Sequence, residues 1–448
     1  MRGDRARHVL AAFATALATV VVPSPAAAQD LPPSAPPPHD PYVFVANAKL
    51  GVEPSVRTID SIGRLVFRYE EVLPFEDHPE KGFADKAVSV LGRSLKLIFL
   101  DEPIAELTAT TSHEIAGHGS RGRELGLQPT FLFNVPGVYR LLFAPPDDVE
   151  SAGGYTSFHA TEPLEDTKEA VVTLGGLEAN YVHAWWINAR IVQQRGWVHH
   201  GALLTYGVSK MAYADTFLSP SIEHAGAPSP NDVRSYVTSL QELSNGWRAE
   251  DRRRIARRLT AGYLWNLVDP TLLYSIYGVA VASVYRGERV SRMPLPTIGT
   301  WHVFPSPRFG LTPFGAEQAL DVFLSPQKGG AVVDLYARVG TSGLASYWGG
   351  GLRVLGSEIV SRHVPLGLEL DVWRQPEILL EERGLFDRPN RMGMNAGLFA
   401  DFRVLGGRRR DDPRVGIATK LAVKTPGYIA GQPLAGGPHG YVGLSLYW

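Results

Sequence analysis

The C-terminal third of the chain alternates between apolar and polar residues with a period of two. Between Val364 and Val372 every second residue is apolar, whereas Glu369 and Asp371 lie on the opposite face. Such alternation is typical of β-strands that separate an apolar environment from a polar one. The pattern recurs in eight segments, near residues 302–311, 318–325, 331–339, 344–356, 362–374, 391–405, 414–424 and 438–448. Eight strands of this kind predict a closed antiparallel β-barrel over residues 296–448.

Two kinds of barrel fit this alternation, a soluble one with an apolar interior and a membrane one with an apolar exterior. The chain ends in HGYVGLSLYW, in which Val442, Leu444 and Trp448 share one face. This ending resembles the last strand of bacterial outer-membrane barrels, which commonly finishes with an aromatic residue. Charges of opposite sign on the other face can pair in a narrow, polar lumen. The membrane barrel is therefore favoured, with outer-membrane lipid as a partner and residues 425–438 as an extracellular loop; a soluble β-domain is the alternative.

The N-terminal end carries signals for export. A basic start, a short apolar run and the Ala26-x-Ala28 pattern predict a secretory signal peptide over residues 1–28. Residues 29–41 are rich in proline, which favours an extended linker. The chain has no cysteine, so no disulfide can stabilise the exported protein, and its formal net charge of -1 argues against a nucleic-acid partner. We therefore expect the protein in the outer membrane of a Gram-negative-type bacterium.

Residues 42–295 follow a helical pattern instead. We expect helices at 85–100, 166–195, 200–217, 230–243, 250–267 and 270–285, and another that begins at Asp101. Asp101 is expected to cap its helix, because Pro103 follows in the first turn. The apolar segment 270–285 is too short and too rich in tyrosine for a confident membrane span, so we expect a buried helix there.

The segment TTSHEIAGHGSRG, residues 110–122, places two histidines around a glutamate and three further residues. The familiar zinc motif H-E-x-x-H is one residue shorter, because residues four apart lie only about 40° apart around an α-helix. The longer spacing turns His118 about 140° away from His113, so a regular helix cannot direct both at one ion. We therefore predict a π-bulge in the motif, which absorbs the additional residue. Gly117 supplies the backbone freedom that a bulge needs.

The run HEIAGHGS, His113 to Ser120, resembles the H-E-x-x-x-H-G-S segment of dipeptidyl peptidase III, a zinc peptidase with this longer spacing. In that family both histidines bind zinc, the glutamate between them activates a water molecule, and a glutamate on a later helix is the third protein ligand. The resemblance implies a gluzincin-like site in which His113 and His118 bind Zn2+ and Glu114 is the general base. It is confined to these residues.

A hydrolytic zinc ion needs a third protein ligand and leaves one position open for water. Glu178 is our first candidate, since it lies on the later helix where the resemblance implies a glutamate. The glycine pair at 175 and 176 would let that helix approach the motif helix closely. Glu124 and Asp269 are alternatives, although a helix cap explains Asp269 more simply.

Catalysis also needs a donor for the negative charge that develops on the scissile carbonyl oxygen. Tyr181 and His183 are the first candidates, because they follow the expected ligand by about one helical turn. Tyr155 and His159, in a glycine-rich region, are alternatives. The pair His199-His200 is expected at the surface, at the start of a helix, rather than at the metal.

These features predict a secreted zinc-dependent metallopeptidase that acts on peptide or protein substrates. Its fold class would be α+β, with a mostly α-helical, zincin-like periplasmic domain over residues 42–295 followed by the eight-stranded antiparallel β-barrel. Zinc would polarise the scissile carbonyl while Glu114 takes a proton from water and passes it to the leaving amine. The alternative is a non-enzymatic outer-membrane barrel protein whose helical part is a periplasmic interaction or plug domain. Bound metal at stoichiometric level would distinguish the two.

Overall fold

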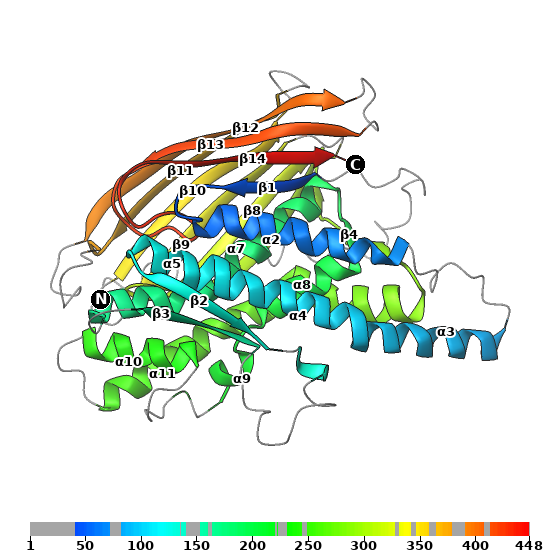
Figure 1. Ribbon diagram of the computed structural model, residues 1–448, viewed down its shortest axis with the longest axis horizontal. Coiled ribbons are helices and arrows are strands. Elements are labelled where there is room, and N and C mark those ends of the chain that lie inside the picture. Colours follow the sequence, from blue (N-terminus) through cyan, green and yellow to red (C-terminus); the bar gives the residue numbers. More distant parts are fainter. Residues whose placement is uncertain are drawn as a thin grey trace.

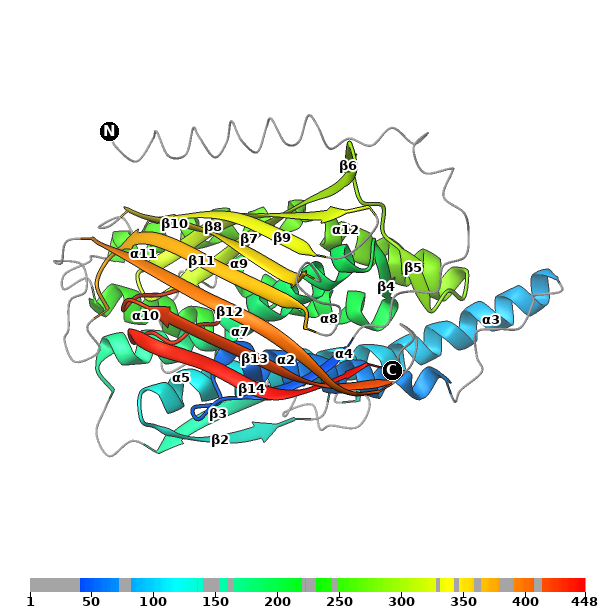
Figure 2. The ribbon, with the colours of Figure 1, turned by 90° about the horizontal axis from the view of Figure 1, so that it is seen from above.

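The computed structural model of the chain describes residues 41–71, 82–134, 136–139, 153–159, 164–219, 222, 231–243, 249–327, 331–341, 346–357, 364–378, 390–406 and 413–447. The predicted signal peptide, the linker up to residue 40 and the terminal Trp448 lie outside the described residues. A curved antiparallel sheet arches over a layer of helices (Figure 1). The long helix α7 (Asp166–Gln193) runs beneath the strands in the view from above (Figure 2).

Helices occupy most of the chain before the sheet, and most lie at the predicted places. The helix over 52–67 was not predicted, and the helix predicted over 200–217 is interrupted by a turn at 211–213. The α-helices are α2 (Val52–Phe67), α3 (Phe83–Lys96), α4 (Glu102–Thr111), α5 (Gly119–Glu124), α7, α8 (His200–Lys210), α9 (Ala214–Phe217), α10 (Asp232–Leu243), α11 (Ala249–Tyr263) and α12 (Pro270–Tyr277). The π-helical segments are η3 (Leu97–Asp101), η4 (Ser112–His118) and η8 (Gly278–Tyr285), and the 3-10 segments are η2 (Arg68–Glu71) and η7 (Leu264–Val268).

Of the two predicted helix caps, Asp269 is confirmed and Asp101 is wrong. Asp269 caps α12, because its side chain accepts hydrogen bonds from the backbone N–H groups of Thr271 and Leu272, at 2.9 and 3.1 Å. Asp101 caps no helix, since the backbone stays helical from α3 through α5 and the Asp101 side chain is buried. Pro103 has no N–H group to donate to the preceding turn. The π-helical segment η3 lies in that turn and changes its hydrogen-bonding pattern, so that the helix continues past the proline.

All eight predicted strands are present, and two further strands lengthen the sheet. Its strands are β1 (Tyr42–Ala46), β6 (Thr297–Ile298), β7 (Trp301–Thr312), β8 (Gly315–Pro326), β9 (Val332–Thr341), β10 (Ser346–Ser357), β11 (Leu366–Gln375), β12 (Arg391–Gly406), β13 (Arg414–Lys424) and β14 (Gly437–Tyr447). Neighbouring strands are antiparallel in the order β1-β14-β13-β12-β11-β10-β9-β8-β7-β6. Two separate pairs join β2 (Gln128–Phe133) to β3 (Gly154–His159) and β4 (Trp197–His199) to β5 (Val290–Arg292).

The sheet does not close into the predicted eight-stranded barrel. Its last strand, β14, pairs with β1, so that Phe44 lies opposite Leu444, and β7 lies at the other side of the sheet. The physical reason is helix α7 on the concave side. A helix with its side chains is about 10–12 Å across, whereas an eight-stranded barrel has room only for side chains. A sheet that curves around a helix therefore stays open.

The polarity of the two sheet faces matches the prediction for a membrane barrel. Leu370 and Leu444 are exposed on the outer face, as predicted. On the concave face the buried Lys420 ammonium donates to Glu369 at 2.9 Å and to Glu53 of α2 at 2.6 Å. The sheet thus pairs its charges against the helices and exposes apolar side chains.

The connection 425–438, which we predicted as an extracellular loop, folds back against the helices. Tyr428 and Leu434 are buried in the hydrophobic cluster that contains α7. The backbone N–H of Gly431 donates to the Glu178 carboxylate on α7 at 2.7 Å. This apolar, glycine-rich segment therefore finds its partners inside the sheet, and its extracellular location stays a prediction.

The helices and the strands share hydrophobic clusters along α7. One cluster joins Leu174 and Leu177 of α7 to Phe309 of β7 and to residues of α10 and α11. A second joins Ile187 of α7 to Phe323 of β8. The change from helices to strands falls near the predicted boundary at residue 296, yet the two regions pack against each other along the whole of α7.

We expect the pairing of β1 with β14 to be detectable by disulfide formation, because the chain has no cysteine of its own. The double variant Phe44→Cys, Leu444→Cys puts thiols on directly opposed residues of antiparallel strands, within reach of a disulfide. Oxidation of the purified protein should then give a faster band on a non-reducing gel. The control pair Val303→Cys, Leu444→Cys should stay reduced, and a crosslink between those two positions would indicate a closed barrel.

Candidate metal centre

The motif lies in the π-helical segment η4, which confirms the predicted bulge. The bulge turns both imidazoles to the same side, so that the Nε2 atoms of His113 and His118 lie 3.2 Å apart. The two rings meet edge to face at 79°, and both are buried. A regular α-helix would have directed them to nearly opposite sides.

Asp232, the first residue of α10, brings a carboxylate to the same point. Its Oδ2 atom lies 2.8 Å from Nε2 of His113 and 3.0 Å from Nε2 of His118. Two nitrogen atoms and one oxygen atom therefore converge, although Asp232 follows His118 by 114 residues. Asp232 was not among the predicted ligands.

Helix α7 orients both imidazoles through their other nitrogen atoms. Nδ1–H of His118 donates to the carbonyl oxygen of Val172 at 2.7 Å. Nδ1 of His113 lies 3.2 Å from Nδ2 of Asn180, whose Oδ1 is buried without a partner among the described residues. Rotation of the Asn180 amide by half a turn lets Oδ1 accept from Nδ1–H of His113. Both Nε2 atoms then keep a lone pair for a cation, as in known histidine metal sites.

Glycines allow η4 and α7 to approach this closely. A Cβ atom at Gly117 would lie 2.5 Å from the Cα atom of Gly176, and a Cβ atom at Gly176 would overlap the His113 ring. The predicted role of the glycine pair at 175 and 176 is therefore confirmed.

Glu114 lies beside the two histidines. A carboxylate oxygen of Glu114 and one nitrogen of each imidazole all lie within 4.8 Å of one another. The hydroxyl of Thr156 on β3 donates to Oε2 of Glu114 at 2.6 Å, so the β2–β3 pair fixes this carboxylate. A carboxylate in this place can accept a proton from a water molecule next to a bound ion.

Tyr213 brings a hydroxyl group to the same centre. It donates to Oδ2 of Asp232 at 2.8 Å and lies 3.5 Å from Nε2 of His113. The backbone of Tyr213 has a φ of 58°, in the left-handed region that few residues other than glycine adopt. Strained residues of this kind cluster at functional sites. The hydroxyl is a candidate donor to a developing oxyanion.

The three converging groups fit a zinc ion. Zinc–ligand distances of about 2.0–2.1 Å in a tetrahedron put neighbouring ligand atoms about 3.3 Å apart, and the three observed separations are 2.8, 3.0 and 3.2 Å. Burial by itself lowers the pKa of His118, but the Asp232 carboxylate raises that pKa to about 9. A proton therefore balances the carboxylate at neutral pH, and this proton must leave when a metal ion binds.

Glu178, the predicted third ligand, does not face the histidines. Arg121 donates to it through Nη2 and through Nε, the latter at 2.7 Å, and Gly431 N–H donates at 2.7 Å. Glu124, its alternative, accepts from the same guanidinium at 2.6 Å. The reason is helical phase: Glu178 lies two residues after Gly176, about 200° around α7. The geometry does not support either glutamate as a ligand.

The predicted catalytic residues Tyr181 and His183 also have other surroundings. Tyr181 lines a space between α7 and the sheet together with residues of the strands. Nδ1 of His183 lies 3.0 Å from Ser112 Oγ, and its Nε2 lies 3.4 Å from Oδ1 of Asp60. The alternatives on β3, Tyr155 and His159, are exposed. On β3 it is Thr156, the neighbour of Tyr155, that touches the candidate centre.

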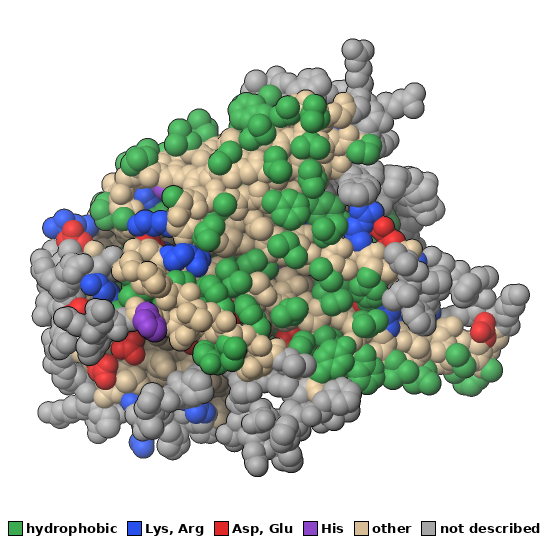
Figure 3. Space-filling view, viewed as in Figure 1, with side chains coloured by type: hydrophobic (Ala, Val, Ile, Leu, Met, Phe, Trp, Pro, Cys, Tyr) green, Lys and Arg blue, Asp and Glu red, His purple; other side chains and the backbone are tan. Residues whose placement is uncertain are grey.

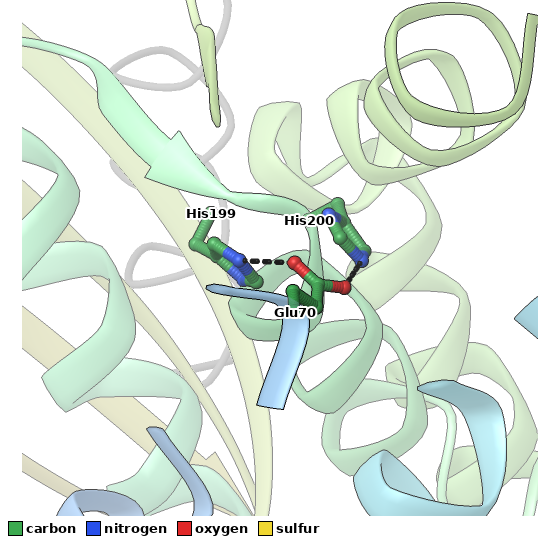
Figure 4. Close-up of side chains that lie close together, drawn as sticks. All are labelled: Glu70, His199 and His200. Carbon is green, nitrogen blue, oxygen red and sulfur yellow. Dashed lines mark hydrogen bonds and ion pairs between the residues drawn. The ribbon is translucent and has the colours of Figure 1, made fainter. Parts of the chain in front are cut away.

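A second histidine–glutamate group lies between α8 and the end of α2. Glu70 places Oε2 at 2.9 Å from Nε2 of His199 and Oε1 at 2.9 Å from Nε2 of His200 (Figure 4). The prediction of a surface position is wrong for His200, which is buried. Nζ of Lys96 lies 2.5 Å from Oε1 of Glu70 and 3.4 Å from Oδ2 of Asp101. Burial lowers the pKa of His200, but its hydrogen bonds with Asp101 and Glu70 raise that pKa to about 9. The Lys96 ammonium and the His200 imidazolium therefore balance the two carboxylates, which favours an ion-pair network over a metal site.

Asp232 and Tyr213 could not be found from any spacing in the sequence. Asp232 lies in the first turn of a predicted helix, where acidic residues are common because they interact with the helix dipole. Tyr213 lies in a turn between α8 and α9, where the sequence predicted an uninterrupted helix over 200–217. Only the packing of α10 and this turn against η4 identifies them.

We expect Gly176→Ala to abolish metal binding, because the added methyl group would displace the His113 ring. Gly92→Ala on α3 is the matched control, since a Cβ atom there meets no atom within 4 Å. Zinc content after dialysis should fall for the first variant and stay at the wild-type level for the second. Full zinc content in Gly176→Ala would contradict the contact between α7 and the motif.

Comparison with known protein families, with curated proteins and with solved structures finds no match for this chain.

Proposed function

We propose that this protein is a zinc-dependent hydrolase of peptide bonds, anchored in the outer membrane by its sheet. The observation that carries the proposal is the convergence of Nε2 of His113, Nε2 of His118 and Oδ2 of Asp232, with separations between 2.8 and 3.2 Å. These three residues would hold the ion, with Asp232 in the role that the resemblance to dipeptidyl peptidase III implies for a glutamate. Two histidines and one carboxylate form the ligand set of several catalytic zinc sites.

The proposed chemistry assigns one role to each neighbouring group. A zinc ion held there supplies a Lewis acid that polarises a carbonyl group and lowers the pKa of water. Glu114, held by Thr156, accepts a proton from the attacking water and returns it to the leaving amine. The Tyr213 hydroxyl donates to the oxyanion of the substrate. Burial of the centre strengthens each of these interactions, because little water screens them.

The sheet supports the proposed membrane location. The outer face of β12 carries apolar residues at alternate positions from Met392 to Val404, whereas Asn395 and Asp401 lie on the concave face. The strands β7 to β14 have 10 to 16 residues each. About 9–11 residues suffice for a tilted strand to cross a bilayer. The predicted signal peptide would bring the chain to that membrane.

The choice of third ligand can be tested with two carboxylate variants. Asp232→Ala should weaken zinc binding by about 100-fold or more, because loss even of an indirect partner of a zinc ligand costs about 10- to 100-fold. Glu178→Gln should keep the zinc affinity but lower the free energy of unfolding by roughly 1.5–3 kcal/mol, since it removes one of the two carboxylates that pair with the buried Arg121 and leaves only Glu124. Zinc titration and chemical denaturation measure both effects. The opposite pattern, with zinc lost only from Glu178→Gln, would restore the glutamate as the ligand.

The hydrolase proposal itself depends on Glu114. Glu114→Gln should retain zinc and lose hydrolysis of a peptide library by about 100-fold or more, because an amide cannot accept the proton from water. Glu288→Gln makes the same chemical change at an exposed position of a different segment, and its activity should equal that of the wild type. Wild-type protein without stoichiometric zinc would instead favour the non-enzymatic alternative. Unchanged hydrolysis by Glu114→Gln would exclude its role as the base.

A further inference from the structure

We propose that the face of the helical region formed by α2, α3 and α12 lies in the bilayer beside the sheet, so that lipid acyl chains contact these three helices as well as the strands. This proposal replaces our expectation of a periplasmic helical domain. It rests on the proposed membrane location of the sheet but does not depend on hydrolase activity.

Helix α3 has the polarity of a lipid-facing helix. Val88, Leu91, Leu95 and Ile98 follow the spacing of one helical face, and all four are exposed. The charged residues Arg93 and Lys96 are buried on the other face. A helix at the surface of a soluble protein has the opposite arrangement, with its apolar stripe toward the core.

Each buried charge of α3 has a partner inside the protein. The Arg93 side chain donates to the carbonyl oxygens of Val284 and Tyr285 at 2.7 and 3.2 Å. Lys96 forms its ion pair with Glu70. Such pairing is expected where the surroundings of a helix are apolar, because a charge directed toward lipid is costly.

Helix α12 repeats this inverted pattern. Leu273 and Ile276 are exposed, whereas Thr271 and Ser275 are buried. Our prediction of a buried helix at this position was therefore wrong for one face. No single helix in the described ranges is long and apolar enough to cross a membrane, but Arg252–Val268 and Pro270–Tyr285, bent by 58°, pass that test together.

Helix α2 completes the surface at the open edge of the sheet. The Thr58 hydroxyl accepts from the N–H of Val45 and donates to its carbonyl, both at 2.9 Å. The Ser61 hydroxyl does the same for Val43, at 2.8 and 3.0 Å. Two side chains of a helix thus take the place of the next strand. Each unpaired backbone group would cost several kcal/mol in lipid.

The apolar surface continues from the sheet over these helices. The outward face of α2 exposes Ile62, Leu65 and Val66, next to the edge strand β1. Figure 3 shows apolar side chains over the outer face of the sheet and, below it, over the helices as far as α3. Apolar patches on soluble monomers are typically no larger than about 300–600 Å². Exposed apolar side chains on the strands and on three helices indicate one apolar medium around both.

Spin labels on single cysteines can test this surface, since the chain has none of its own. The positions are Leu91→Cys on α3, Ile276→Cys on α12 and Leu398→Cys on β12, which are 60, 66 and 65 % exposed. Arg391→Cys, at the start of β12, is the matched control, with a side chain that is 66 % exposed. The labelled full-length protein is reconstituted into phosphatidylethanolamine–phosphatidylglycerol vesicles. Collisions of each label with oxygen, which partitions into acyl chains, are compared with collisions with a water-soluble nickel chelate.

We expect a ratio of oxygen to nickel collisions several times higher at the first three positions than at Arg391. A low ratio at Leu91 and Ile276 with a high ratio at Leu398 would overturn this inference and leave the proposed location of the sheet intact. Low ratios of oxygen to nickel collisions at all three positions would reject both this inference and the proposed membrane location of the sheet. Protection of Leu91 or Ile276 from both probes would show a protein partner or a second copy in place of lipid, and would also overturn it. Zinc content and hydrolysis do not enter these readouts.

Discussion

Helix α7 on the concave side of the sheet is the constraint on which the rest of the structure depends. Its volume keeps the sheet open, and its residues contribute to the clusters that join helices to strands. One face, with Gly176 and Asn180, supports the candidate metal centre. The other face places Glu178 in a buried pair with Arg121 and against the returning loop at Gly431. The Glu178 charge is tolerated in the interior because Arg121 pairs with it and both of its oxygen atoms accept hydrogen bonds.

The candidate centre shows how a change of helical period creates a site. A five-residue spacing is unsuitable for an α-helix, but the π-helical segment η4 brings His113 and His118 to one side. The two imidazoles are then fixed by α7 and Glu114 by the β2–β3 pair, and α10 adds the Asp232 carboxylate. The donors therefore come from separate elements, each held by its own hydrogen bonds, which limits their freedom to move apart. Preorganisation of this kind is what a catalytic metal site requires.

Polarity is inverted on the sheet and on helix α3, and this has structural consequences at both the sheet and the helices. The concave face collects paired charges such as Lys420 with Glu369, and α3 turns Arg93 inward. Hydroxyl groups of α2 saturate the edge strand β1. In water such an edge could be hydrated, whereas in an apolar medium every backbone group needs a partner within the protein.

The sequence by itself determined most of the helices before residue 296, the eight strands after it, the polarity of their faces and the need for a π-bulge. These features depend on local periodicity, which the chain carries in neighbouring residues. It could not determine that β14 pairs with β1, that the loop 425–438 folds inward, or that Asp232 rather than Glu178 lies beside the histidines. Each of these depends on contacts between residues that are far apart in the chain. Asp232 and Glu178 are both carboxylates on helices, and only the rotation of α7 and the position of α10 decide which of them faces His113.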